Sequence, residues 1–314
     1  MKKNVILAFF VLFSYEIWAQ ESETVYNFLR LPVSAHAAAL GGENITIDDD
    51  DPTMVFHNPA LVSNVSDRSL NLNYMTYMEG VKVASASFVK ACRQRATWAV
   101  EAQYVDYGSM KQTTIDNEII GEVSAKDIAV GGTFTYALSN KIAGGVTAKF
   151  VSSSLAGYNS IGMAVDLGIN YFNPELGLSV SAVARNLGGQ LKAYEDDFEK
   201  LPFDLQLGVS KRLGESPLRF SLTFTRLHDW DDKFANHLVF GAEAFLSDNI
   251  WIGGGINPRR SDEMKISDGE SESSHGAGLS LGGGLQLERF KLQVAYGKYH
   301  VSASSLIINV TYTI

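Results

Sequence analysis

Hydrophobic and polar residues alternate along most of this chain with a period of two. In the segment 201–213, apolar positions alternate with polar or small ones: Phe203, Leu205, Leu207 and Val209 against Asp204, Gln206, Gly208 and Ser210. Side chains of a strand point to opposite faces in turn, so this pattern predicts one apolar and one polar face. The alternation recurs from Arg68 to Ile314 without a long helical period, which predicts an all-β fold.

Matching this period along the chain predicts about fourteen strands. The predicted spans are 68–77, 80–91, 95–106, 124–139, 141–154, 159–172, 176–187, 201–213, 217–228, 237–247, 250–257, 276–288, 290–299 and 304–314. The last span alternates up to Ile314, and closing a barrel removes its free edges, so we expect it to pair with the first.

The lengths of the predicted connections follow a rule. Every second connection is short, and all the long ones fall at the other joints: 107–123, 188–200, 229–236 and 258–275. Outer-membrane barrels have short periplasmic turns and longer outer loops, whereas a soluble sandwich has no reason to sort its loops this way. The connections therefore predict a transmembrane antiparallel β-barrel over residues 68–314.

Charged residues of the predicted strands fall on the polar face. The predicted lumen-facing charges are Lys149, Asp166, Arg185, Asp204, Arg212, Arg219, Glu243 and Glu288. A lipid-facing Arg or Lys at the bilayer midplane costs about 2–4 kcal/mol, so the charged face is predicted to line the interior. We interpret these charges first as structural pairs and second as a permeation path.

The first 67 residues do not alternate. Lys2 and Lys3 precede an apolar run from Val5 to Phe13, and Ala19 follows a few residues later, which predicts a signal peptide over 1–19. An anchor helix is the alternative, but the run is shorter than the roughly 20 residues that span a bilayer. About fourteen strands enclose more space than their side chains fill. Residues 20–67 are therefore predicted to fold into the barrel as a hatch, with a short helix at 34–40.

No candidate catalytic, metal or cofactor site emerges from the sequence. The six histidines lack metal-ligand spacing, and no nucleophile motif is present. We interpret the acidic run Asp48–Asp51 as a solvated turn, with a divalent-cation site as the alternative. The glycine runs 253–255 and 282–284 lie within predicted strands, where small inward residues leave room for a hatch. A net charge of −9 disfavours nucleic acid as a partner, and the single Cys92 excludes an intrachain disulfide.

Two stretches of the predicted hatch resemble a known family. The segment 28–42, FLRLPVSAHAAALGG, and the segment 56–60, FHNPA, resemble the FadL-like outer-membrane barrels and, within them, the PorV/PorQ family of the type IX secretion system. The motif positions are Pro32, Gly41, Gly42, Asn58, Pro59 and Ala60. The resemblance implies a fourteen-stranded barrel in a bacterial outer membrane, in which these residues shape the hatch.

The resemblance also implies a function. Members of this family act in a cell-surface attachment complex that anchors secreted cargo, with a PorZ-like surface protein, a PorU-like sortase and a PorV-like barrel as partners. We therefore expect a non-enzymatic barrel whose outer loops tether a surface partner. The alternative is a FadL-like transporter of hydrophobic small molecules. An outer-membrane enzyme is disfavoured because no Ser, His and acid set converges in the sequence.

Overall fold

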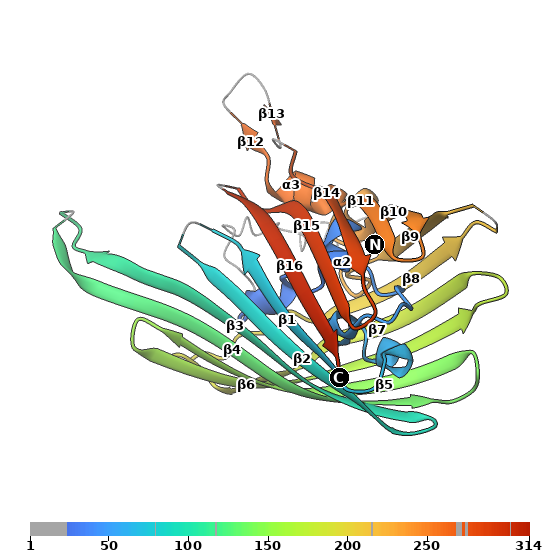
Figure 1. Cartoon of the computed structure of the whole chain (residues 1–314). Helices are drawn as coiled ribbons and strands as arrows, with labels where there is room; N and C mark the ends of the chain where they lie inside the picture. Colours follow the sequence, from blue (N-terminus) through green and yellow to red (C-terminus); the bar gives the residue numbers. More distant parts are fainter. Residues whose placement is uncertain are drawn as a thin grey trace, which may run out of the picture.

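The computed structural model describes residues 24–314 except positions 79, 117, 215, 268–271, 274, 275 and 302. The predicted signal peptide lies outside the described residues. Fourteen antiparallel strands of the described chain close into a single barrel (Figure 1). The final strand β16 pairs with β1, with Leu72 opposite Val310. The predicted fourteen-stranded antiparallel barrel is confirmed, and so is its closure by the last strand.

Each barrel strand pairs with its neighbours along the chain, and a two-stranded hairpin lies outside the ring. The barrel strands are β1 Ser69–Thr76, β2 Lys82–Arg93, β3 Ala96–Thr113, β4 Ile119–Ala137, β5 Ile142–Leu155, β6 Tyr158–Asn173, β7 Leu178–Lys192, β8 Asp204–Arg212, β9 Leu218–Phe224, β10 Leu238–Ser247, β11 Ile250–Ile256, β14 Leu279–Gln286, β15 Phe290–His300 and β16 Ala303–Thr313. The hairpin consists of β12 Ile266–Ser267 and β13 Glu272–Ser273.

Helical segments of the described chain are short. Four lie in the hatch: η1 Asn27–Arg30, α2 Ala35–Ala39, η2 Pro52–Phe56 and η3 Pro59–Asn64. Two lie in loops: η4 Phe234–His237 and α3 Pro258–Glu263. None of the helices in the described residues has the length and apolar character needed to cross a bilayer.

The barrel wall is apolar outside and polar inside. Along β1, Asn71 is fully buried while the adjacent Leu72 is 57% exposed. The same inversion recurs on β6, where Asp166 is buried and Leu167 is 47% exposed. A soluble protein would not expose such a belt, because apolar surface in water is unfavourable. The outer face is therefore the surface that contacts lipid.

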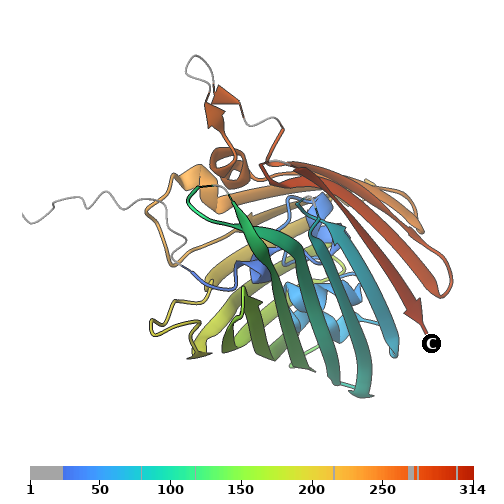
Figure 2. The same ribbon diagram turned by 90° about the vertical axis from the view of Figure 1, so that its left-hand side faces the viewer.

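All the long connections lie at one end of the barrel. They span 193–203, 225–237 and 257–278. Turns at the other end have at most five residues, as at 213–217. The predicted sorting of loops is confirmed, and the long-loop end is the extracellular end. Figures 1 and 2 show the β12–β13 hairpin standing clear of the wall at this end, beyond α3.

Two predicted loops are partly strand. Residues 107–123 were expected to form a loop, but β3 and β4 continue as a paired ladder to Thr113 and from Ile119. This part of the β3–β4 ladder carries polar side chains on both faces. Such a pattern suits strands that extend beyond the membrane, because both of their faces are then in water. The predicted loop 188–200 likewise begins inside β7, which ends at Lys192.

The main apolar core of the described residues lies between hatch and wall. Val25, Phe28 and Leu29 of the hatch pack with Met75 and Ile307 of the wall near the extracellular end. Further along, hatch residues form a cluster with Val89 and Ala99 of the wall. The hatch thus supplies the interior that the barrel lacks, as Figure 2 shows by its position within the ring. The predicted hatch is therefore seen in the described part of 20–67.

A charge on the apolar belt will destabilise the barrel. Leu167 lies near the middle of β6, so Leu167→Arg is expected to lower the free energy of unfolding by about 2–4 kcal/mol. Leu176→Arg is the control, because Leu176 is 53% exposed in a periplasmic turn. Urea unfolding in lipid vesicles gives the free energy of unfolding of both variants. An equal loss of this free energy in the two variants would contradict the assignment of the belt to the lipid-facing surface.

Candidate functional site: the hatch and the barrel around it

The Ala-rich helix α2 lies against the barrel wall because both surfaces are made of small residues. Ser34 caps the helix by accepting a hydrogen bond from the Ala37 amide at 3.1 Å, as the sequence predicts. The helix is followed by Gly41 and Gly42, whose φ angles of 99° and 93° are rarely adopted by other residues. The chain can therefore turn sharply where it touches the wall.

Inward glycines of the wall provide the space for α2. A Cβ atom on Gly255 would lie 2.2 Å from the Gly41 nitrogen, and one on Gly282 would lie 2.7 Å from Cβ of Ala39. On β10, a Cβ on Gly241 would lie 2.8 Å from Cβ of Leu40. The interpretation of the two glycine runs as room for a hatch is consistent with these contacts.

The Asn-Pro-Ala turn is fixed to the opposite wall. Asn58 accepts a hydrogen bond from the Ala60 amide at 2.9 Å and donates one to the Ile45 carbonyl at 3.1 Å. The Pro59 carbonyl accepts from the Thr135 hydroxyl of β4 at 2.6 Å. Pro32, at the start of the other stretch, is buried. The motif residues thus shape the hatch and hold it to the wall.

Gly145 of β5 and Gly168 of β6 allow this turn to approach the wall. A Cβ on Gly145 would lie 2.4 Å from the Pro59 carbonyl carbon, and one on Gly168 would lie 2.2 Å from the Asn58 side-chain oxygen. The hatch therefore meets glycines on two sides of the barrel. Larger residues at these positions would collide with backbone or with a fixed polar group.

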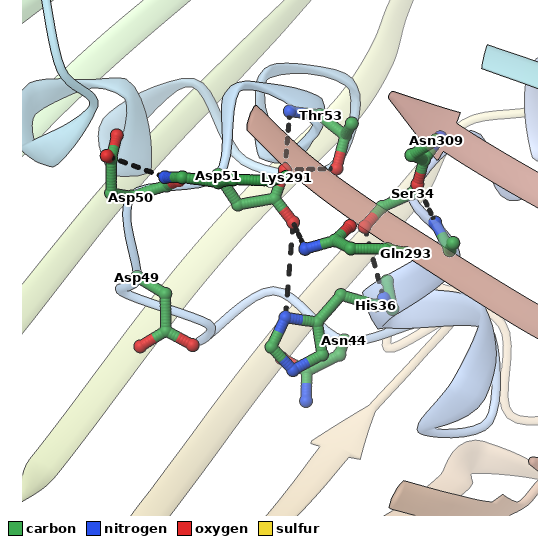
Figure 3. Close-up of polar contacts among 12 residues, drawn as sticks. Ser34, His36, Asn44, Asp49, Asp50, Asp51, Thr53, Lys291, Gln293 and Asn309 are labelled. Carbon is green, nitrogen blue, oxygen red and sulfur yellow. Dashed lines mark hydrogen bonds and ion pairs between the residues drawn. The ribbon is translucent and has the colours of Figure 1, made fainter. Parts of the chain in front are cut away.

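Two ion pairs connect the acidic run to the wall. Arg219 of β9 donates from both terminal nitrogens to Asp49, at 2.9 and 2.5 Å, and from Nε to Glu243 of β10. Lys291 of β15 lies 2.6 Å from an Asp50 carboxylate oxygen, and Figure 3 shows this pair beside the hatch. A bidentate arginine–carboxylate pair fixes geometry as well as charge.

The acidic run is therefore a set of wall contacts, and its interpretation as a solvated turn was wrong. Asp51 is 2% exposed and accepts from Gln293 at 3.1 Å. Burial raises the pKa of Asp48 to about 6. Burial also opposes ionisation of Asp50, but hydrogen bonds from Lys291 and Ser66 outweigh it and lower its pKa. No group of metal-ligating side chains occurs in the described part of the chain.

His36 joins α2 to the same charged network. Its ring is stacked on Trp251 of β11, with centroids 3.8 Å apart. Its Nε2 lies 2.7 Å from a Glu243 oxygen, and its Nδ1 lies 4.0 Å from Asp51 (Figure 3 shows the Asp51 side). No spacing pattern points to this residue, because its partners lie up to 215 positions away on other strands.

Most of the predicted lumen-facing charges lie inside the barrel. Lys149 pairs with Asp166, and Arg185 lies 3.5 Å from Glu43 of the hatch. Asp204 accepts hydrogen bonds from Gln206 at 2.7 Å and from the Arg226 amide at 2.6 Å. Arg219 and Glu243 form the network described above.

Arg212 faces inward at the mouth of the barrel, opposite Arg219, whereas Glu288 lies outside the lumen. Arg212 ends β8 at the periplasmic rim, where it is exposed and its guanidinium lies 4.6 Å from the centre of the Phe245 ring. Glu288 was predicted to face the lumen, but it lies exposed in the turn between β14 and β15. The alternation ends with β14 at Gln286, so parity no longer sets the direction of Glu288. Lys291 also lies inside and was not predicted, although its parity with Gln293 on β15 would have placed it there.

An apolar groove marks the outer wall opposite α2. It encloses about 630 Å³ and is lined mainly by residues of β9, β10, β11 and β14, among them Phe240, Ala242, Gly254 and Leu281. Small outward residues create the hollow, and a single layer of strands separates it from Leu40 of the hatch. Because it lies on the lipid-facing side, the groove suits an apolar molecule.

No protein-family model matches the sequence, and no curated protein matches it either. Solved structures do. The toluene transporter TodX of Pseudomonas putida aligns with a TM-score of 0.60 at 12% identity, over 91% of this chain and 99% of TodX. The monoaromatic hydrocarbon channel CymD gives 0.60 at 14% identity, over 90% and 97%. A FadL homologue of Pseudomonas aeruginosa gives 0.55 at 10% identity, over 90% and 99%.

A closed fourteen-stranded ring with an apolar exterior defines a transmembrane outer-membrane barrel. The solved structures narrow this class: the chain has the FadL-like barrel fold. The apolar belt and this fold together place it in a bacterial outer membrane.

The close contact between hatch and wall is directly testable. Gly255→Ala is expected to lower the free energy of unfolding by about 1–3 kcal/mol, because the added methyl group meets backbone atoms of the hatch that cannot move aside. Gly132→Ala on β4 is the control, since nothing lies within 4 Å of its added Cβ. Urea unfolding compares the two, and a Gly255→Ala variant as stable as the control would show that α2 does not lie against β11.

Proposed function

We propose that the chain is a PorQ-like component of the type IX secretion system. It acts in the cell-surface attachment complex as a non-enzymatic barrel that tethers a PorZ-like surface protein for anchoring secreted cargo. A PorU-like sortase and a PorV-like barrel complete the proposed set of partners. The main support is the hatch motif, because the two stretches that resemble this family are the ones fixed to the wall by Gly255, Thr135 and their neighbours.

The way the hatch fills the lumen is a second observation in favour of a scaffold role. The acidic run is held by ion pairs to Arg219 and Lys291, and the hatch core packs into the barrel interior. A lumen filled in this way suits a protein that displays its outer loops. Such a role requires surfaces at the extracellular end that can bind another protein.

The extracellular loops present exposed aromatic side chains. Trp230 is 54% exposed and Phe234 is 62% exposed, and their rings are stacked with centroids 6.4 Å apart. Exposed aromatic residues are frequent anchors of protein interfaces. The loop that carries them is braced by α3, through hydrogen bonds from Arg259 to the Asn236 carbonyl at 3.2 Å and from Lys233 to Asp262 at 3.1 Å.

Substitution of these aromatic residues tests whether the extracellular loops bind a surface partner. In the protein purified from its native outer membrane, the double variant Trp230→Ser, Phe234→Ser is expected to recover at least tenfold less surface partner, measured by mass spectrometry. Leu176→Ser, an equally exposed apolar residue at the periplasmic end, is the control. Heat-modifiable migration on gels shows that each barrel is folded. Full recovery by both the double variant and a deletion of 264–275 would count against docking at this end.

The groove favours a second candidate, a transporter of hydrophobic small molecules. It is apolar and lies one strand layer from the hatch. Two of the similar structures are described as a toluene transporter and a monoaromatic hydrocarbon channel.

Uptake of a long-chain fatty acid or of toluene by whole cells separates the two candidates. A transporter is expected to lose most uptake when Gly254→Leu fills the groove, while Gly132→Leu at an open outward position of β4 has no effect. A scaffold is expected to show no uptake above that of cells lacking the protein. Uptake that depends on Gly254 would therefore replace the tether with transport as the leading function.

A further inference from the structure

A small polar cavity lies at the extracellular end, between η1, α3 and the wall. It encloses about 200 Å³. Its charged lining consists of Arg30, Arg185, Arg226, Arg259 and Arg260, with Glu43, Asp204 and Glu263. Five guanidinium groups thus face three carboxylates. Glu263 is 54% exposed, so the cavity has access to water at this side.

Internal contacts leave several of the arginine donors unused. Arg185, Arg259 and Arg260 are 6–8% exposed, yet each keeps one buried N–H nitrogen without a hydrogen-bond partner in the described part of the chain. Buried donors of this kind are rare in folded proteins because their desolvation is uncompensated. Three such donors around one cavity indicate that it accepts a ligand with several acceptor oxygens.

Arg30 is the clearest case. Its guanidinium makes no hydrogen bond and no ion pair with any described residue, although the residue is only partly exposed. Burial and the nearby charge of Arg226 lower the pKa of Arg30 to about 10, while the charges of Asp204, Glu43 and Glu263 partly oppose this, so Arg30 remains protonated at neutral pH. An unpaired guanidinium beside another cation is unfavourable unless an anion lies between them.

The carboxylates in and beside the cavity pair with arginines other than Arg30. Glu43 lies 3.5 Å from Arg185 and accepts a hydrogen bond from Gln206 at 3.1 Å. Glu263 lies 3.6 Å from Arg259 and 3.9 Å from Arg226. Asp232, outside the lining, pairs with Arg259 at 2.7 Å. These acids neutralise part of the positive charge and leave an excess at the centre.

We propose that this cavity binds a phosphate group that enters from the extracellular side. Guanidinium groups match phosphate oxygens with paired N–H donors, and a phosphate supplies the acceptors that the buried nitrogens lack. The phosphate belongs either to a soluble molecule or to a lipid headgroup of the outer leaflet. The site is independent of whether the protein tethers a partner or transports an apolar molecule.

Isothermal titration calorimetry of the full-length protein, in a non-ionic detergent at low ionic strength, tests whether this cavity binds phosphate. The probes are inorganic phosphate, glucose 1-phosphate and dihexanoyl phosphatidate, and glucose is the uncharged control. We expect saturable binding of at least one phosphate and none of glucose. Binding of the soluble phosphates assigns a soluble ligand, whereas binding of phosphatidate alone assigns a lipid headgroup.

Three variants of the cavity and one control connect the binding to this site. Arg30→Gln and Arg226→Gln are expected to weaken it at least tenfold, and Arg95→Gln in a periplasmic turn leaves it unchanged. Glu43→Gln removes a competing carboxylate without changing shape, so it is expected to tighten binding at least threefold. Absence of phosphate binding would overturn the proposal, as would affinities that none of the three cavity variants alters.

Discussion

The bilayer requires every backbone N–H and C=O group of a spanning strand to be paired inside the protein, because hydrocarbon offers no hydrogen bonds. This chain meets the requirement by closing fourteen strands into a ring, β1 against β16. Closure with the apolar face outward turns the polar residues inward. The ring is then too wide for its own side chains to fill. A barrel of this width therefore needs a segment that fills its interior.

The hatch fills the barrel interior by two kinds of complementarity with the wall, one of shape and one of charge. Where the backbone of the hatch contacts the backbone of the wall, as at Gly41 and Gly255, both residues are glycines without a side chain. Where charges meet, Arg219 is shared by Asp49 of the hatch and Glu243 of the wall. Removing one partner of a buried ion pair typically costs about 3–5 kcal/mol, because the other charge is left uncompensated. The charges thus specify where the hatch lies, while its apolar clusters supply the core.

Features governed by local alternation could be predicted from the sequence. The number of strands, their faces and the end that carries the long loops depend on patterns within a few residues, and the pairing of the last strand with the first follows from closure of the ring. Prediction failed where the partner lies far away in the chain. The acidic run resembles a solvated turn until Arg219 and Lys291 are brought beside it.

Two other errors have local causes. The ladder of β3 and β4 continues outside the membrane without an apolar face, so alternation could not reveal it. Glu288 follows the end of its strand, where alternation no longer applies. The arginine cavity could not be predicted, because its residues come from the hatch, from α3, from three strands and from the loops between strands, among them Arg226 after β9.

The position of the hatch inside the barrel is the central claim, and a disulfide bond tests it most directly. A Cβ on Gly208 of β8 would lie 2.7 Å from Cγ2 of Thr46 in the hatch, which brings the two Cβ atoms close to disulfide spacing. In a Cys92→Ser background, the pair Thr46→Cys and Gly208→Cys is predicted to oxidise nearly completely in isolated outer membranes. Two free thiols in a folded barrel after oxidation would contradict the account.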